Sequence, residues 1–255
     1  MIDLRCGDCL EVMKDIPDKT IDMILCDLPY GITHNKWDEI IPLDKLWEQY
    51  NRKIKDNGVI VLFANQPFTT QLISSNKKDY KYNWIWIKNN PTNILNSHKQ
   101  PLRCYEEICV FYKKQPTYKN INSEPNYWKR KKPQNMKCYG KVNKTEFEGL
   151  TGCNRNILEF KNKNGSSKKR LHPTEKPVEL LKYLIEIYTN EGETVLDNCA
   201  GSMSTVIASI NTNRNCIAIE KDKNYFEIGK KRVIEHLKTN NISTNLVIRD
   251  NECAI

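Results

Sequence analysis

Residues 21–31 read IDMILCDLPYG, and this stretch decides the fold. Apart from one aspartate its first six residues are apolar, which is typical of a strand buried on both faces of a parallel sheet. The run ends in Asp27, followed by Leu-Pro-Tyr-Gly. Open α/β sheets bind ligands just beyond the carboxyl ends of such strands. The stretch therefore predicts a buried strand that presents Asp27 and Tyr30 at an active-site edge.

The strand end suits an exocyclic amino group of a nucleobase. Pro29 fixes its own φ and biases Leu28 away from helix, so the neighbouring groups are presented in one arrangement. Asp27 can accept one N–H of the amine and the carbonyl of Leu28 or Pro29 the other, while Tyr30 stacks on the ring. A base inside a duplex must be flipped out to reach such a pocket. The alternative is a strand and a tight turn in which Asp27 is only a cap.

Residues 27–30 resemble the Asp-Pro-Pro-Tyr motif of amino-group DNA methyltransferases, which binds the target amine. Leu28 departs from that motif at its second position, which contributes its backbone more than its side chain.

A chain of 255 residues is long enough for one large α/β domain, or for one domain with an inserted lobe. No stretch approaches the roughly 18 to 20 apolar residues of a membrane span, and the N-terminus lacks a signal segment, so we expect a cytoplasmic protein without a membrane partner. Cys6 and Cys9 form a C-x-x-C pair, but no second pair stands at zinc-ligand spacing, and we predict no metal site.

The positive charge is concentrated in one segment. Residues 113–170 hold 16 Lys or Arg against 4 Asp or Glu, although the whole chain carries only +9. Aromatic residues such as Trp128 are interleaved with these charges. A basic segment in an otherwise slightly acidic chain indicates a polyanionic partner. The alternative is a solvated, lysine-rich loop.

Hydrophobic patterns predict alternating strands and helices. We expect strands at residues 1–6, 21–27, 59–63, 83–88, 107–112, 193–197 and 215–220, and helices at residues 8–16, 43–55, 69–75, 177–188 and 206–210. The strands at 83–88 and 107–112 are expected to pair across a long polar loop. Together these elements predict an α/β fold with an open, mostly parallel sheet and helices on both faces.

The last expected strand-helix-strand unit fits a nucleoside cofactor. Gly201 would let the backbone approach the cofactor, and Glu220, which ends the strand 23 positions after Asp197, would accept ribose hydroxyls. Asp8 is either a helix cap or an acceptor for an adenine amino group. A purely structural unit without a cofactor is the alternative.

The order of the motifs is similar to that of beta-class amino-group DNA methyltransferases. DLPY at 27–30 is followed by the basic segment, by HPTEKP at 172–177 and by DNCAGS at 197–202. The resemblance implies a Rossmann-like methyltransferase sheet with a circularly permuted motif order and a small basic insertion. It also implies a catalytic half at 1–112, a target-recognition segment at 113–170 and an S-adenosylmethionine-binding half of the same domain at 171–255.

The resemblance also implies roles for individual residues. The catalytic set would be Asp27, Pro29 and Tyr30, and the S-adenosylmethionine-binding set Asp8, Thr174, Lys176, Asp197, Cys199, Gly201, Ser202 and Glu220. Met203 departs from the pattern, which has a glycine there. If position 203 needs a positive φ, methionine costs about 1 to 2 kcal/mol and is expected to crowd the cofactor.

The implied activity is methylation of the adenine N6 amino group in double-stranded DNA. Aspartate at position 27 favours adenine, because cytosine-N4 members more often carry serine there. Cytosine-N4 methylation and a degenerate DNA-binding remnant with impaired cofactor binding are the alternatives. An RNA or protein amide methyltransferase usually has asparagine at this position. The recognised site, a homodimeric state and a cognate restriction endonuclease stay open.

Overall fold

The computed structural model describes residues 1–31, 38–121, 126–131, 146–151, 153–162 and 175–250. Its strands are β1 (Ile2–Cys6), β2 (Ile21–Asp27), β3 (Ile54–Ala64), β4 (Tyr80–Thr92), β5 (Arg103–Phe111), β6 (Asn126–Lys131), β7 (Glu146–Thr151), β8 (Ile157–Glu159), β9 (Thr194–Asp197), β10 (Asn215–Glu220) and β11 (Leu246–Arg249). Its α-helices are α1 (Cys9–Val12), α2 (Leu43–Lys53), α3 (Phe68–Ser75), α4 (Val178–Tyr188), α5 (Ser204–Asn211) and α6 (Lys223–Thr239), and short 3-10 helices span Met13–Asp15 and Ile94–Asn96.

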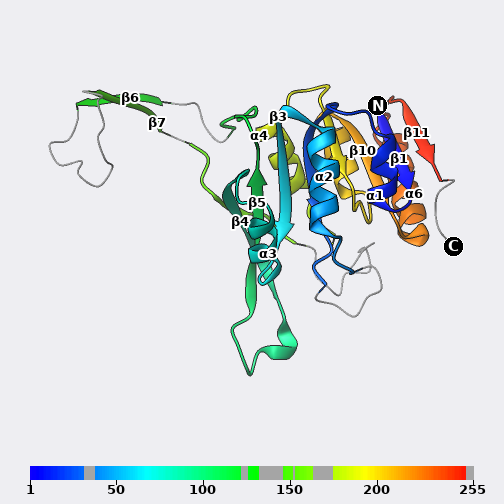
Figure 1. Ribbon diagram of the computed structural model, residues 1–255, viewed down its shortest axis with the longest axis horizontal. Coiled ribbons are helices and arrows are strands. Elements are labelled where there is room, and N and C mark those ends of the chain that lie inside the picture. Colours follow the sequence, from blue (N-terminus) through cyan, green and yellow to red (C-terminus); the bar gives the residue numbers. More distant parts are fainter. Residues whose placement is uncertain (32–37, 122–125, 132–145, 152, 163–174, 251–255) are drawn as a thin grey trace.

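Nine strands form one sheet in the order β11-β1-β10-β9-β2-β3-β5-β4-β8. The pairs from β11 through β3 are parallel, and β5 runs antiparallel to both β3 and β4. The first strand of the chain therefore lies between the last two (Figure 1). The predicted open, mostly parallel Rossmann-like sheet is confirmed. Among the described residues, strands β6 and β7 form a separate two-stranded antiparallel sheet.

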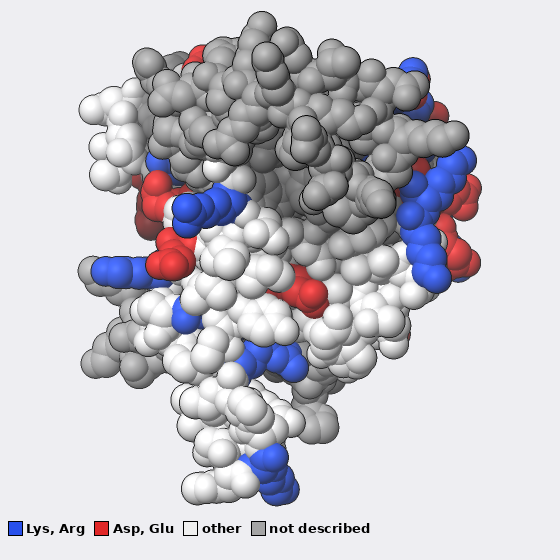
Figure 2. Space-filling model, turned by 90° about the vertical axis from the view of Figure 1, so that its left-hand side faces the viewer, with Lys and Arg blue, Asp and Glu red and all other residues white. Residues whose placement is uncertain are grey.

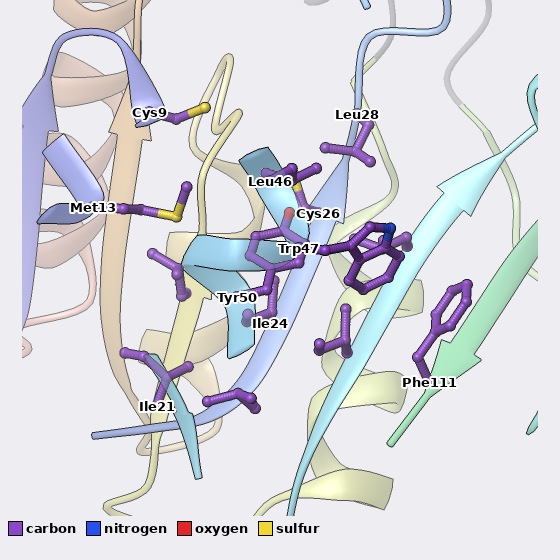
Figure 3. Packing of buried hydrophobic residues seen from close by; sticks show 14 of the residues in the cluster. Cys9, Met13, Ile21, Ile24, Cys26, Leu28, Leu46, Trp47, Tyr50 and Phe111 are labelled. Atoms are coloured by element: carbon purple, nitrogen blue, oxygen red, sulfur yellow. The ribbon is translucent and has the colours of Figure 1, made fainter. Parts of the chain in front are cut away.

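Helices cover both faces of the large sheet because its central strands are apolar on both sides. On one face α1, α2 and α3 pack over side chains such as Ile24 and Cys26, as Figure 3 shows for the residues of α2. On the other face α4 packs over Met23 and Leu25, and α5 and α6 pack over β1 and β10. Alternate residues of β2 thus contribute to two different cores.

The β4–β5 pair is longer than its apolar pattern predicts. Pairing continues to Thr92 and Arg103, well beyond the predicted ends at 88 and 107, so that much of the expected loop is a protruding arm (Figure 1). Asn90 and Asn162 exchange three backbone and side-chain hydrogen bonds of 3.1 to 3.4 Å at the base of this arm. Residues 89–105 contain no Asp or Glu. Polar cross-strand pairing, which has no apolar signature, explains why the sequence pattern stopped short.

Three elements of the large sheet region were not predicted, namely β8, α6 and β11. The chain beyond Glu220 is rich in charged residues, and the short edge strand β11 lies next to β1. Within the part of the chain that the structure describes, no helix is both long enough and apolar enough to span a membrane.

Candidate active site

A cavity of about 1230 Å³ opens where the carboxyl ends of β2, β9 and β10 meet. Every predicted site residue that the structure describes lines it: Asp8, Asp27, Pro29, Tyr30, Lys176, Asp197, Cys199, Gly201, Ser202 and Glu220. Thr174 lies outside the described residues. Strands β9 and β2 are neighbours. From β2 the chain continues to β3 on one side of this pair, and from β9 it continues to β10 on the other side. The cavity therefore lies at the switch point of the sheet, where open α/β folds bind ligands.

Tyr30 holds one oxygen of Asp27. Its hydroxyl donates to Oδ1 of Asp27 over 2.6 Å, and its ring packs 5.3 Å from that of Phe68. The backbone N–H groups of Tyr30 and Gly31 donate to Oδ1 of Asp38 over 2.8 and 2.9 Å. Asp38, which was not among the predicted site residues, thus holds the turn that follows β2. Burial and the charge of Asp27 raise the pKa of Tyr30 well above its ordinary value, so the phenol stays protonated and remains a donor.

A row of alternating charges surrounds the other oxygen of Asp27. Nζ of Lys176 lies 2.5 Å from Oδ2 of Asp27 and 3.2 Å from Oε2 of Glu106. Oε1 of Glu106 lies 2.9 Å from Nζ of Lys88. We call these four side chains, Lys88, Glu106, Lys176 and Asp27, the charge quartet. All four line the cavity, and Lys88 and Glu106 were not among the predicted site residues.

Burial and the neighbouring charges shift the pKa values of three members of the charge quartet. Burial raises the pKa of Asp27, although the attraction of Lys176 opposes this. Burial also pushes the pKa of Glu106 upward, but the ammonium groups of Lys176 and Lys88 outweigh it and hold that pKa below its ordinary value. The pKa of Lys176 is raised in spite of burial, because both carboxylates attract its charge. Lys176 is therefore a cation at neutral pH.

The ends of β9 and β10 carry carboxylates of a different kind. Oδ1 of Asp197 accepts from the backbone N–H of Cys199 over 3.1 Å, and Glu220 accepts from the N–H groups of Gly201 and Asp222 over 2.7 and 2.8 Å. Burial raises the pKa of Asp197 to about 6 and that of Glu220 to about 7. The thiol of Cys199 has its pKa raised by hydrogen bonds with Cys26 and Cys9 and by burial, so it stays neutral.

Arg232 of α6 connects the turn after β9 to the segment before α4. Its Nη1 donates to the carbonyl oxygen of Ser202 over 2.8 Å and to Oγ of Ser204 over 3.0 Å. Its Nη2 lies 2.9 Å from Oε1 of Glu175. Because Glu175 directly precedes Lys176, this arginine anchors the backbone of the lysine. No sequence signal marked Arg232, since α6 itself was not predicted.

Asp8 combines two contacts at the rim of the cavity. Oδ1 accepts from the backbone N–H of Leu10 over 2.9 Å, as an N-cap of α1, and Oδ2 lies 3.3 Å from Nζ of Lys221. Both side chains are partly exposed. The capping interpretation of Asp8 thus describes its contacts in the protein, and Asp8 is also among the residues that line the cavity.

Met203 has a positive φ of 61°, the conformation considered from the sequence. Its side chain, however, does not line the cavity but is fully buried among residues of β1, β10 and α6. A Cβ built on Gly229 would lie 2.4 Å from Cγ of Met203, so the glycine of α6 makes room for it. A methionine in this conformation costs about 1 to 2 kcal/mol. The expectation that Met203 crowds the cofactor is wrong, because the side chain points away from the cavity.

The residues at β9 and β10 fit a nucleoside cofactor. Gly201 has a φ of 50° and brings bare backbone to the cavity, and the acceptors of Glu220 and Asp197 suit hydroxyl and amino donors. Among the described residues no group of three or more His, Cys, Asp or Glu side chains has the arrangement of a metal site. The arrangement can thus hold an organic cofactor beside an amine acceptor.

Residues 21–231 match a protein-family model described as DNA methylase. The type II methyltransferase M.HpaI of Haemophilus parainfluenzae is 26% identical over 244 residues, which are 90% of this chain and 73% of the relative. The DNA adenine methyltransferase YhdJ of Escherichia coli K12 is 28% identical over 253 residues, which are 89% of this chain and 81% of the relative.

Solved structures share the fold. The M1.HpyAVI–SAM complex superposes with a TM-score of 0.61 and 26% identity, covering 91% of this chain and 99% of that one. The PvuII DNA methyltransferase, described as cytosine-N4-specific, has a TM-score of 0.68 at 13% identity, covering 96% of this chain and 94% of that one. The second likeness concerns the fold alone.

Proposed function

The chain belongs to the DNA methylase family whose model matches residues 21–231, and from this membership we propose that it methylates the N6 amino group of adenine in double-stranded DNA. The observation that carries the proposal is the convergence on one cavity of an amine acceptor, Asp27, and a nucleoside-type site at Gly201 and Glu220. A nucleotide with an exocyclic amine and a nucleoside cofactor are the two ligands that this pair of sites suits.

Asp27 and Tyr30 orient the target amine. The carboxylate of Asp27 accepts one N–H, and a carbonyl of Leu28 or Pro29 accepts the other, so the nitrogen lone pair points away from these acceptors. Holding two reactants in line accounts for much of the rate enhancement of such enzymes. Asp27 need not be a strong base, because the amine becomes acidic only once it carries the methyl group. The base must leave the duplex to reach the cavity.

Asp197, Glu220 and the Gly201 turn hold the cofactor, and Asp8 and Lys176 border its site. S-adenosylmethionine, when bound, supplies the methyl group as an electrophile. Ser202 contributes chiefly through its backbone carbonyl, which is held by Arg232. Cys199 stays a neutral thiol.

Two observations support adenine over cytosine. Position 27 is aspartate, whereas serine is more frequent there in relatives that methylate cytosine N4. The relative YhdJ, at 28% identity, is described as a DNA adenine methyltransferase. Cytosine N4 is the second candidate target, since its amine offers the same two donors to Asp27.

Double-stranded DNA is the proposed partner of the basic segment at 113–170. The arm between β4 and β5 adds a surface whose residues 89–105 contain no Asp or Glu, and Figure 2 shows it projecting from the body with basic side chains on the visible face. Phosphate contacts from such surfaces set affinity, and base contacts set the recognised site. A homodimer and a cognate restriction endonuclease would accompany a palindromic site in a restriction-modification system.

The test is modified-base sequencing of genomic DNA from a methylation-deficient host that expresses the protein or its Asp27→Ala variant. We expect N6-methyladenine in one short motif with the wild type and none with the variant. N4-methylcytosine in a motif would establish the second candidate. Unmodified DNA in the presence of folded wild-type protein would contradict the proposed activity and favour a DNA-binding remnant.

A further inference from the structure

Both oxygens of the Asp27 carboxylate have a donor from the protein itself. Oδ1 accepts from the hydroxyl of Tyr30, and Oδ2 lies 2.5 Å from Nζ of Lys176. An amine that binds Asp27 must therefore share the charge of this carboxylate with a buried ammonium group. A neutral N–H donor competes poorly with an ammonium, because hydrogen bonds between charged partners are the stronger ones.

Lys176 has a second acceptor within reach. Oε2 of Glu106 already forms an ion pair with Nζ at 3.2 Å, but among the described residues no donor makes a hydrogen bond of good geometry to this buried oxygen. The other oxygen of Glu106, Oε1, accepts from Lys88 over 2.9 Å. A movement of the ammonium by roughly half an ångström would turn the ion pair with Oε2 into a short charge-assisted hydrogen bond. A buried acceptor whose hydrogen bond is poorly formed is costly, so Oε2 gains from such a movement.

We propose that Lys176 is a switch: its ammonium moves from Asp27 to Oε2 of Glu106 when the target amine engages Asp27, and Glu106 is the positioning residue that receives it. The identity of the incoming amine rests on the proposed function. The switch itself rests on the distances within the charge quartet.

Charge balance favours the exchange within the quartet over any movement toward water. Lys176 is only 8% exposed, and an isolated buried charge is strongly unfavourable. The quartet holds two ammonium groups and two carboxylates, so it stays neutral with Lys176 on either carboxylate. Lys88 keeps Glu106 ionised and ready to accept, since it stays on Oε1 throughout.

The contacts around Lys176 and Glu106 hold the backbone in place, so only the side chain of Lys176 moves. Glu106 is opposite Trp86 in the β4–β5 register, and the backbone before Lys176 is anchored through Glu175 and Arg232. Nζ of Lys176 lies 5.1 Å from the centre of the Phe63 ring. A flat aromatic face attracts a cation without fixing its direction, so the ammonium can slide between its two acceptors.

A crystal structure of the Asp27→Asn variant tests the switch without DNA. Removing the charge of Asp27 should send the ammonium to Glu106, with Nζ within 3.0 Å of Oε2 and the residue 27 side chain released. The wild-type crystal structure is the control for the starting distances. The switch is overturned if Nζ stays on residue 27 and Oε2 still has no donor.

Single-turnover methylation tests the role of Glu106, with tritiated S-adenosylmethionine and DNA from methylation-deficient cells. We expect Glu106→Gln to slow transfer 10- to 100-fold and to leave cofactor affinity within about twofold. Glu107→Gln is the matched control, because Glu107 contacts Gln66 and Asn83 and does not line the cavity. It should stay within about twofold of wild type.

A double variant separates a switch from a merely structural role. If Glu106 acts through Lys176, Glu106→Gln should have less than about a twofold effect on methylation in a Lys176→Met background. An equal slowing in both backgrounds, or full activity of Glu106→Gln alone, would overturn the proposal. Thermal unfolding checks that each variant is folded.

The two proposals fail in different ways. If folded wild-type protein methylates no DNA, the proposed function fails, and the Asp27→Asn structure still decides where Lys176 goes. If Glu106→Gln does not fold, the same structure decides the question with Glu106 intact.

Discussion

The three strand ends that meet in the cavity hold their carboxylates in two opposite ways. At the end of β2, Asp27 lies against the ammonium of Lys176 within the charge quartet. At the ends of β9 and β10, Asp197 and Glu220 accept from backbone N–H groups. In the described part of the chain no Lys or Arg forms an ion pair with either of them.

The difference separates a site for exchange from a site for fixed binding. An ammonium on a flexible stem can leave a carboxylate, whereas a backbone N–H cannot. The β2 end is thus suited to release its partner when a target amine arrives. The β9 and β10 ends keep their donors and offer their remaining lone pairs to hydroxyls. Without a compensating cation, burial raises the pKa of Glu220 to about 7, so its protonation follows the solution pH.

The largest expected effect is a loss of methyl transfer at the β2 end, without a loss of cofactor binding at the β9 and β10 ends. Asp27→Ala should slow methyl transfer by a factor of about 1000 or more, equivalent to about 4 kcal/mol, because the amine loses its charged acceptor. Cofactor affinity should change by less than about threefold, as measured by calorimetry. A parallel loss of cofactor affinity would show that the two ends do not work independently.

The second prediction concerns the cost of the unpaired carboxylate of Glu220. Its pKa is raised from 4.5 to about 7, so ionisation in the folded protein costs stability as pH rises from about 4.5 to about 7. The free energy of unfolding of the cofactor-free wild type, relative to that of Glu220→Gln, should therefore fall by up to about 3 kcal/mol between pH 4 and pH 8. Because glutamine keeps only one acceptor oxygen for the two N–H groups, the comparison is the change of this difference with pH, measured by urea unfolding. A difference that does not change with pH would show that the carboxylate is not destabilised by burial.

The third prediction tests the rigidity of the turn after β9. Gly229→Ala places a Cβ 2.4 Å from Cγ of Met203 and should destabilise the protein by about 1 to 3 kcal/mol, measured by chemical denaturation. Adding Met203→Ala should restore part of the loss, because it removes the clash. Strict additivity of the two changes would show that Met203 and Gly229 are not coupled.

The smallest expected effect is the pH dependence of cofactor binding. The ionised carboxylate of Glu220 offers more acceptor sites to ribose hydroxyls than the protonated form. Wild-type affinity for S-adenosylmethionine should therefore increase as pH rises through about 7. Glu220→Gln should bind about tenfold more weakly at pH 8 and show a flat pH profile. An unchanged pH profile in the variant would assign the titration to another group.

Most of the predicted site residues reach one cavity because they follow directly from a strand end, whereas Lys176 reaches it from the segment before α4. Asp27, Asp197 and Glu220 terminate apolar runs, and the carboxyl ends of parallel strands share one edge. Lys88 and Glu106 also lie at this edge of the sheet, but they were not predicted as site residues. Strand β5 runs antiparallel, so its beginning, not its end, lies at this edge. The boundary of β5 was placed one residue after Glu106, which left that carboxylate in a loop.

The sequence by itself determined the order of most strands and helices as far as Glu220, the acids that end the strands and the motifs between them, because these depend on local periodicity and on the backbone preferences of proline and glycine. Only the tertiary structure decided which of these residues touch. Arg232 lies 30 positions from Ser202, and Lys176 lies 149 positions from Asp27. The direction of the Met203 side chain was decided in the same way, by the space that Gly229 leaves. Such contacts follow from strand direction and packing, which no local pattern encodes.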